Sequence, residues 1–290
     1  MTVGSAIRTQ LARRAPRLEE RVVRANWRRR NRDRSFSGAV PPQLEGVVEN
    51  LRRDGVVISD FDTVFGGATE LFEAADALVR QRYEQERPNA EEGGKGFLTK
   101  LASGPYGIGD PFPRLSLDPR ALAVANAYLE LRSTLRSIDL WHTRPTPGPA
   151  AETQLWHRDA DDVMNVKMFV YFTDVTRAAG PLCYAPGTHP LGSRRELPER
   201  DERWRSTDEQ LSRVVPEDEW ILCEGPRGSV VFADTCGYHK QLKPAGDERL
   251  LVVSHYVSGT PYVPSTLELH GAEGASLTDD QYVAVHDRAR

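Results

Sequence analysis

Residues 249–257 read Arg-Leu-Leu-Val-Val-Ser-His-Tyr-Val, a short run rich in β-branched and aromatic side chains. Three comparable runs precede it, and turns rich in Pro and Gly separate them: Ser137–Thr143, Val166–Val175 and Gly228–Phe232. Runs of this length and composition, bounded by such turns, are typical of β-strands. We therefore expect the core strands to lie in the second half of the chain.

The first half of the chain has a different periodicity. Residues 42–54 place apolar groups at helical spacing and stop at Gly55, after which Val56–Ile58 is typical of a strand. We expect a second helix over Thr69–Glu86, ending before Pro88, and a third over about Pro119–Arg132. Helices followed by strands predict a mainly β (α+β) protein, with a β-sheet core and flanking helices outside it.

The chain has 290 residues, of which 39% are hydrophobic, enough for one large core. We expect one domain over residues 41–290. Residues 194–218 are polar enough to form a long surface insertion between core strands, and such insertions often cover binding sites.

Positive charge is concentrated at the start of the chain. Residues 1–40 contain eleven Arg and three acidic residues, so they carry +8, whereas the whole chain carries −4. Trp27 lies within this basic stretch, and an indole beside arginines can stack on a base or lie at a membrane surface. We favour the simpler interpretation, a solvated basic arm or a partner-facing helix over residues 1–40, and we do not expect nucleic acid as a partner.

The three cysteines, Cys183, Cys223 and Cys236, are too few and too widely spaced for a disulfide framework or a CxxC metal site. We interpret them as packing residues in a reducing compartment. No run of about 18 apolar residues is present for a membrane span, and the start lacks the apolar stretch of a secretory signal. These features predict a cytoplasmic protein.

The segment Gln154-Leu-Trp-His157-Arg-Asp159 contains a His-x-Asp motif. On an extended strand, a spacing of two residues directs both side chains to the same face, where they can bind one ion. A second histidine, His239, lies at the end of the strand-like stretch that begins at Gly228, and the mouth of a barrel would bring it opposite the first pair. Two imidazoles and one carboxylate suit iron(II) and leave adjacent coordination positions open for dioxygen and a chelating co-substrate.

Arg249 lies ten residues after His239, at the start of the next strand-like run. Its planar guanidinium matches a carboxylate in two parallel hydrogen bonds. Iron(II), one aspartate, a 2-oxoglutarate dianion and one arginine together sum to zero charge, which suits a buried pocket. Any one of these elements is a weak signal, but their order along an all-β stretch is much more specific.

These residues resemble the phytanoyl-CoA dioxygenase-like family of iron(II)/2-oxoglutarate oxygenases. The resemblance covers about residues 42–260, and it rests on the residues above together with Leu51–Ile58, Thr173–Val175 and Gly180–His189. It implies a double-stranded β-helix (jelly-roll, cupin-like) core, with His157, Asp159 and His239 as metal ligands and Arg249 as the arginine that binds the distal carboxylate of 2-oxoglutarate. Asp159 favours hydroxylation or a related oxidation, because related halogenases replace this carboxylate with a small residue.

Five further residues are weaker candidates. Lys167 can meet the co-substrate or an acidic substrate, although an exposed lysine is the commoner case, and His142 can line the cavity or be structural. Phe169 and Tyr171 share the face of Lys167 by the two-residue period, so they can wall the substrate pocket or simply pack in the core. Arg158 can touch substrate or form a surface ion pair.

The sequence thus predicts an oxygenase that uses Fe(II), 2-oxoglutarate and dioxygen on a small molecule, with no catalytic residue beyond the metal triad. One alternative is a cupin-like metalloenzyme that uses another divalent metal, and a second is a non-catalytic metal-binding sensor or interaction protein. There is no Walker A loop and no Gly-x-Ser-x-Gly motif, so phosphate-driven and serine-hydrolase chemistry are not expected. Substrate identity and oligomeric state are not determined by the sequence.

Overall fold

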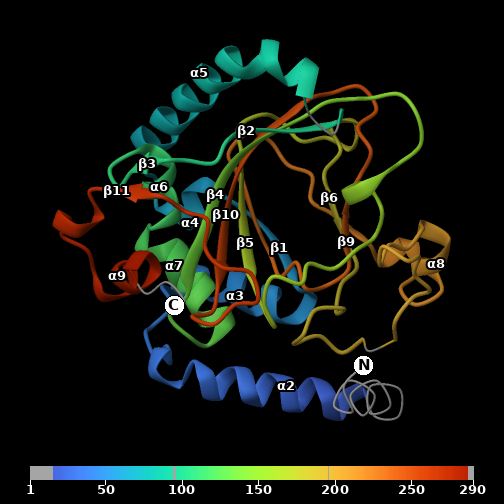
Figure 1. The fold of residues 1–290 in the computed structure, drawn as a ribbon, viewed down its shortest axis with the longest axis horizontal. Coiled ribbons are helices and arrows are strands. Elements are labelled where there is room, and N and C mark those ends of the chain that lie inside the picture. The colour runs from blue at the N-terminus through green and yellow to red at the C-terminus, as the bar shows by residue number, and fades with distance from the viewer. Residues whose placement is uncertain (1–15, 94–95, 195, 287–290) are drawn as a thin grey trace.

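The computed structural model describes residues 16–93, 96–194 and 196–286 (Figure 1). Its α-helices are α2 (Pro16–Arg30), α3 (Pro42–Asp54), α4 (Phe61–Phe65), α5 (Thr69–Gly93), α6 (Pro111–Ser116), α7 (Pro119–Leu129), α8 (Asp208–Ser212) and α9 (Asp279–His286). Its strands are β1 (Val56–Asp60), β2 (Leu98–Ala102), β3 (Tyr106–Gly107), β4 (Thr134–Thr143), β5 (Val166–Tyr171), β6 (Leu182–Tyr184), β7 (Ile221–Leu222), β8 (Ser229–Ala233), β9 (His239–Gln241), β10 (Arg249–Val257) and β11 (Leu269–His270).

Two antiparallel sheets form the core. The major sheet has six strands in the order β1-β8-β5-β10-β4-β2, and the minor sheet has three in the order β7-β6-β9. A short parallel pair, β3 and β11, lies apart from both. A cavity of about 310 Å³ is lined by β2, β4, β5 and β10 on one side and by β6 and β9 on the other. The two sheets therefore enclose the cavity between them.

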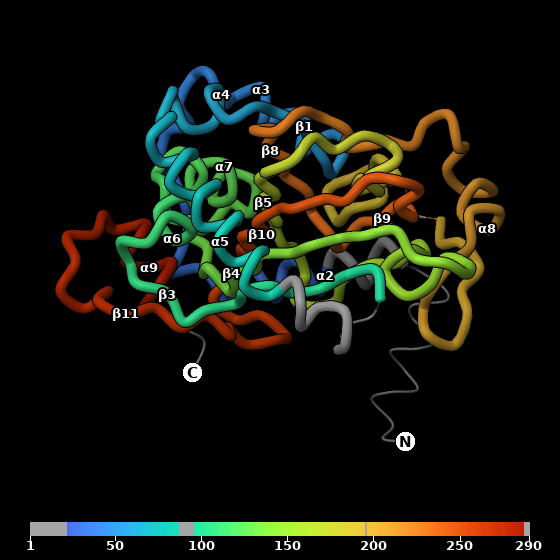
Figure 2. Tube along the Cα trace, turned by 90° about the horizontal axis from the view of Figure 1, so that it is seen from above, coloured from blue at the N-terminus to red at the C-terminus, as the bar shows by residue number. Residues whose placement is uncertain are grey.

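The two faces of the major sheet have different environments, because successive side chains of a strand point to opposite faces. On one face, Met168 of β5 and Val252 of β10 are fully buried in a core that includes Leu122 of α7 and Phe112 of α6. Figure 2 shows α6 and α7 on the side of these strands opposite to β9. The other face lines the cavity, so the helices cover one face and leave the other for ligands.

The expected element boundaries are largely confirmed. α3 covers residues 42–54 and ends at Gly55, whose φ of 85° is the left-handed conformation that glycine adopts readily. β10 coincides with the expected run 249–257. The second helix, however, continues past Pro88 to Gly93, and His239 begins β9 instead of ending the run at 228–232.

The expectation of a solvated basic arm over residues 1–40 does not hold at Trp27, Asn31 and Arg34, which pack against the rest of the chain. Trp27 is only 4% exposed, and its indole Nε1 donates to Asp162 Oδ1 at 2.9 Å. Asn31 and Arg34 are buried as well; Asn31 Oδ1 accepts from the Gly259 amide at 2.9 Å. Trp27 is therefore not available to stack on a base or a membrane. Residues 1–15 lie outside the described residues.

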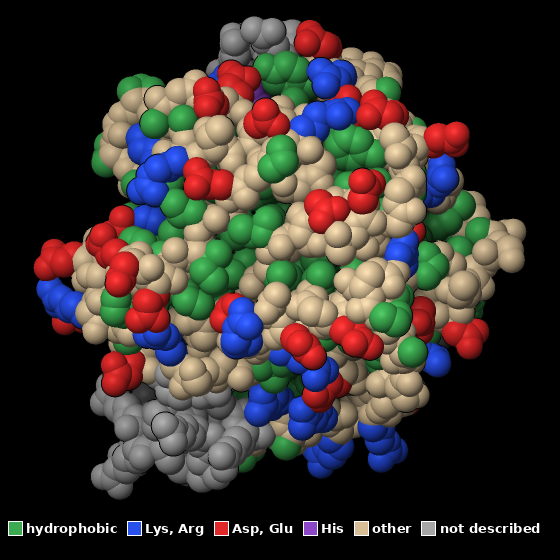
Figure 3. Space-filling view, turned by 180° about the vertical axis from the view of Figure 1, so that it is seen from behind, with side chains coloured by type: hydrophobic (Ala, Val, Ile, Leu, Met, Phe, Trp, Pro, Cys, Tyr) green, Lys and Arg blue, Asp and Glu red, His purple; other side chains and the backbone are tan. Residues whose placement is uncertain are grey.

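The arginines of α2 lie on its outer side. Arg28, Arg29 and Arg30 are exposed, and Figure 3 shows Lys and Arg side chains gathered along the lower edge of the molecule, where α2 lies in Figure 1. The sequence pattern reported the charge of this segment correctly. It did not reveal that the same helix packs its indole against the domain.

The expected insertion contains the short helix α8 and is fixed to the minor sheet. Asp208 accepts a hydrogen bond from Trp156 Nε1 at 2.8 Å and pairs with Lys240 of β9. All three cysteines are buried and unpaired, as expected for packing residues. Within the described ranges, no helix is long and apolar enough to cross a membrane.

Candidate metal centre and co-substrate site

The metal-ligand candidates come from two segments that lie side by side. His157 and His239 form an antiparallel bridge, in which each backbone amide donates to the other residue's carbonyl at 3.0 and 2.9 Å. The Asp159 amide donates to the carbonyl of Thr235 at 2.8 Å. The His-x-Asp motif thus lies on an extended segment, as expected, but this segment makes an isolated bridge to β9 and is not a full strand.

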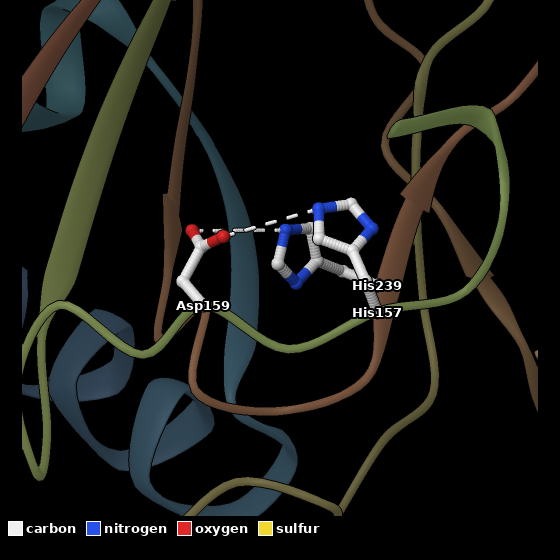
Figure 4. A group of neighbouring side chains, drawn as sticks. All are labelled: His157, Asp159 and His239. Carbon is white, nitrogen blue, oxygen red and sulfur yellow. Dashed lines mark ion pairs between the residues drawn. The ribbon is translucent and has the colours of Figure 1, made fainter. Parts of the chain in front are cut away.

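The three side chains converge at one point (Figure 4). His157 Nε2 lies 3.9 Å from Asp159 Oδ1, and His239 Nε2 lies 3.9 Å from Asp159 Oδ2. Bonds of about 2.1 Å to one ion allow two ligand atoms to stand up to about 4.2 Å apart, so an ion can bridge each of these pairs. A search of the described residues for groups of three or more His, Cys or acidic side chains that could hold a metal finds this group.

The backbone fixes the orientation of both imidazoles. His157 Nδ1 lies 2.9 Å from the carbonyl oxygen of Leu155, and His239 Nδ1 lies 3.0 Å from that of Gly237. A carbonyl only accepts, so each Nδ1 carries the proton and each Nε2 keeps its lone pair for a metal. Contacts of this kind set the tautomer of metal-binding histidines.

The charge states of the three side chains also suit a divalent cation. Burial, together with the neighbouring His239, lowers the pKa of His157 to about 3, and burial lowers the pKa of His239 as well. Burial alone would raise the pKa of Asp159, but the Lys167 ammonium holds it well below its usual range. The site therefore offers two neutral imidazoles and one carboxylate at neutral pH, which is the state that binds metal.

Lys167 lies directly behind the metal-binding carboxylate. Its Nζ donates to Asp159 Oδ2 at 2.6 Å, and the side chain is 21% exposed. The alternative of an ordinary exposed lysine is therefore wrong. A hydrogen bond from a lysine to a metal-ligating carboxylate fixes the orientation of the carboxylate and keeps it ionised.

Arg249 lies on the other wall of the cavity, at the start of β10. It is 6% exposed, its Nη2 donates to Thr143 Oγ1 at 3.4 Å, and its Nε has no hydrogen-bond partner among the described residues. Burial lowers the pKa of Arg249, and no described carboxylate lies within ion-pair distance of it. Because a buried guanidinium without an acid is costly, this position fits the carboxylate of a bound dicarboxylate.

The weaker candidates divide into two groups. Phe169 lines the cavity, but Tyr171, two residues further along β5, donates its hydroxyl to the Cys223 carbonyl at 2.8 Å and packs in the core. Arg158 faces a neighbouring pocket of about 300 Å³, donates to the Cys236 carbonyl and lies over the Tyr238 ring. Tyr171 is thus corrected from a pocket residue to a structural one, whereas Arg158 lines this second pocket together with Asp159.

His142 is also corrected. It does not line the cavity, since it lies on the face of β4 that points away from it. Its Nε2 is 3.0 Å from Glu248 Oε2, and its ring meets the edge of Tyr83. The expectation failed because a strand's two-residue period does not say which face meets the cavity. The neighbouring Trp141 is the residue that lines the cavity.

Several cavity residues were missed from the sequence, among them Gln241, Arg136 and His255. Two carried a usable signal. Gln241 lies two residues after His239 and His255 six after Arg249, so each shares a face with a candidate by the two-residue period. Arg136 precedes the expected strand run, and nothing in its local sequence marks it.

Solved structures show a similar fold. The epimerase SnoN in complex with Fe3+, alpha ketoglutarate and nogalamycin RO has a TM-score of 0.53 at 18% identity, with 81% of this chain and 93% of that chain covered. EctD from S. alaskensis with bound Fe has a TM-score of 0.53 at 14% identity, with 81% of this chain and 83% of that chain covered. AviO1 from Streptomyces viridochromogenes Tue57 has a TM-score of 0.52 at 16% identity, with 78% of this chain and 98% of that chain covered. These similarities confirm the expected jelly-roll core. No curated protein matches significantly.

The buried group of two histidines and one carboxylate suits iron(II), and the family model that matches the chain is that of an iron(II)- and 2-oxoglutarate-dependent oxygenase. A family model described as phytanoyl-CoA dioxygenase (PhyH) matches residues 70–241, which is more than half of the 290 residues. The chain therefore belongs to the phytanoyl-CoA dioxygenase family, and its cofactors are Fe(II) and 2-oxoglutarate. Arg249 lies beyond the matched residues, so its assignment rests on its position in the cavity.

Proposed function

We propose that this enzyme hydroxylates a small molecule, with His157, Asp159 and His239 as the metal ligands and Arg249 as the anchor of 2-oxoglutarate. The observation that carries the proposal is the buried Arg249, which has no acidic partner among the described residues and shares one cavity with the metal triad. A cupin-like enzyme that uses another metal, or a metal-binding sensor, has no need for an arginine in this position.

The protein's own residues would hold the reactants in place. Arg249, with Thr143 beside it, would bind the distal carboxylate of 2-oxoglutarate, and the triad would hold the iron. When bound, the iron and 2-oxoglutarate supply the oxidation of substrate by dioxygen, coupled to conversion of 2-oxoglutarate to succinate and carbon dioxide. Lys167 would keep the Asp159 carboxylate charged and oriented throughout.

Apolar side chains would keep the cavity dry. Trp141, Phe169, Leu251 and Val253 line it between the polar groups. Exclusion of water strengthens the electrostatic contacts inside a site and prevents side reactions. These walls would also place one C–H bond of the substrate near the iron.

The size of the cavity supports a small substrate. Its volume of about 310 Å³ is at the lower end of ligand pockets, and 2-oxoglutarate would occupy part of it.

The three buried thiols agree with a cytoplasmic enzyme, since such cysteines stay reduced there.

The test is an anaerobic titration of the apo-protein with iron(II) and 2-oxoglutarate, which follows the weak visible charge-transfer band of the chelate. We expect the band in the wild type, its loss in His157→Ala, and a much higher 2-oxoglutarate requirement in Arg249→Ala. Arg213→Ala, at an exposed arginine paired with Glu209, is the matched control and should behave as wild type. Bound metal without a band would contradict the oxygenase assignment.

Hydroxylation itself needs a product measurement. Two similar structures are described as an epimerase and a carbocyclase, so consumption of 2-oxoglutarate does not identify the outcome. Mass spectrometry of turnover under labelled dioxygen should show one added oxygen atom in the product. A product of unchanged oxygen content would replace hydroxylation with another oxidation.

A further inference from the structure

A second polar cluster lies at the far end of β10 from Arg249. His255 is six residues after Arg249, on the same face of the strand, and both line the cavity. His255 pairs in register with Lys167 of β5 on one side and with Ser137 of β4 on the other. Side chains from three neighbouring strands thus meet at this end of the cavity.

His255 presents a buried donor without an acceptor. Arg136 Nη1 lies 3.4 Å from His255 Nδ1, and because a guanidinium only donates, Nδ1 accepts and the proton of the neutral ring lies on Nε2. Nε2 is buried and has no partner among the described residues, and the whole residue is 2% exposed. A buried polar group left without a partner is destabilising, so an acceptor from a ligand fits this position.

Two cations, Lys167 and Arg136, lie near His255, and each has one described acidic neighbour. Lys167 donates to Asp159, a metal-ligand candidate, and Arg136 has Asp161 as its described acidic neighbour. The Arg136 Nη2 to Asp161 Oδ1 distance is 3.8 Å, too long for a hydrogen bond, and Asp161 is 23% exposed. Arg136 Nε donates to the Val263 carbonyl at 3.3 Å, but its terminal nitrogens have no described carboxylate within hydrogen-bond distance, and Arg136 lines the cavity.

The co-substrate does not account for both cationic ends. Six residues of an extended strand span about 20 Å, much more than the length of a five-carbon dicarboxylate. If 2-oxoglutarate is held at Arg249, the cluster at His255 is left for another anion. Between the ends lie Phe169 and Val253, which suit an apolar group.

We propose that Arg136, Lys167 and His255 bind the anionic head group, a carboxylate or a phosphate, of the primary substrate, with its apolar body against Phe169 and Val253. This assignment rests on the proposed function, because it places the substrate in the same cavity as the iron and 2-oxoglutarate. His255 Nε2 and the Arg136 guanidinium donate to the head group, while Lys167 supplies positive charge beside the metal-binding carboxylate.

The test uses isothermal titration of the anaerobic protein loaded with iron(II) and 2-oxoglutarate. The probes are phenylacetate, phenyl phosphate and the neutral phenylacetamide. We expect an acid to bind at least about tenfold more tightly than the amide, the usual scale of one charged hydrogen bond. The preferred acid distinguishes carboxylate from phosphate.

Variants then locate the binding. His255→Phe and Arg136→Gln should each weaken binding of the acid by about tenfold, whereas His255→Gln, which keeps an N–H donor, should retain most of the affinity. His142→Phe is the matched control, because it changes a buried histidine on the opposite face of the neighbouring strand. Thermal melting of every variant identifies any that has lost its fold.

Three results would overturn the assignment: no binding of either acid, equal binding of acid and amide, or a loss of 2-oxoglutarate affinity in His255→Phe that matches the loss of acid affinity. The last would place the cluster in the co-substrate site. The proposed function fails by a different result, the absence of the charge-transfer band, so the two failures are distinguishable.

Discussion

The two walls of the cavity differ in how their histidine and arginine nitrogens are satisfied. On the wall formed by β9 and the segment beside it, the backbone carbonyls of Leu155 and Gly237 accept from the two triad histidines. On the wall formed by the major sheet, Arg249 Nε and His255 Nε2 are buried without partners among the described residues. The histidines of the first wall are set for an ion before it binds, whereas Arg249 and His255 on the second wall have hydrogen-bonding capacity left for organic ligands.

This difference reflects what each ligand requires. A metal needs donor atoms held in a fixed geometry, which neighbouring backbone groups supply. A carboxylate brings its own acceptors, so its site consists of donors that no protein acceptor has already occupied. We therefore expect substitutions on the first wall to lower the affinity for the metal, and substitutions on the second wall to lower the affinity for the anions.

The largest effect is expected at the first wall. His239→Ala removes one of the two imidazole ligands, and iron affinity should fall by more than about 100-fold, beyond the usual cost of losing a supporting contact. Equilibrium dialysis with iron(II) measures this, and circular dichroism checks that the variant is folded. Retention of wild-type iron affinity would remove His239 from the proposed site.

At the second wall, Arg249→Gln should weaken 2-oxoglutarate binding by about 10- to 100-fold, because a hydrogen bond to a charged group contributes about 1.5–3 kcal/mol. Its iron affinity should stay within about twofold of wild type, since Arg249 contacts none of the three ligands. Parallel titrations with iron and with 2-oxoglutarate separate the two effects. Loss of both together would contradict the division between the walls.

The pH dependence of stability tests the buried, neutral state of the first wall. Since the folded-state pKa of His157 is lowered to about 3, its contribution to stability is present above the unfolded value of 6.5 and is lost as pH falls from 6.5 towards 3. Each such histidine should contribute a slope of up to about 1.4 kcal/mol per pH unit in that window.

Urea denaturation of the metal-free protein at pH 7.5, 6.5 and 5.5 measures this slope. His157→Gln, which does not titrate, should show a shallower fall in unfolding free energy than wild type. His270→Gln, at an exposed histidine on β11, is the control and should keep the wild-type slope. Equal slopes in all three proteins would contradict a neutral, buried His157.

The smallest effect is expected from the N-terminal helix, which supports the first wall from outside. Trp27→Phe removes the donor to Asp162, three residues after Asp159, although the Ser258 and Val163 amides still donate to that carboxylate. The unfolding free energy should fall by about 1–2 kcal/mol, and iron affinity by less than about tenfold.

Val22→Ala, at an exposed position of α2, is the control and should change neither the unfolding free energy nor the iron affinity. Trp27→Phe with wild-type stability would show that α2 does not support the loop that carries Asp159. A complete loss of iron binding would show the opposite, that the metal-binding wall depends on α2 much more than the other contacts of Asp162 imply.

The sequence by itself determined the order His157, Asp159, His239 and Arg249, the strand 249–257 and the helix 42–54. These follow from short-range rules: a spacing of two puts side chains on one face, and Gly55 ends a helix. Only the tertiary structure decided that Trp27 is buried, that Arg136 and His255 line the cavity, and that His142, Tyr171 and Arg158 do not. Alternation within a strand gives two faces, but the register and packing of separate strands decide which face meets the cavity, and those contacts join residues far apart in the chain.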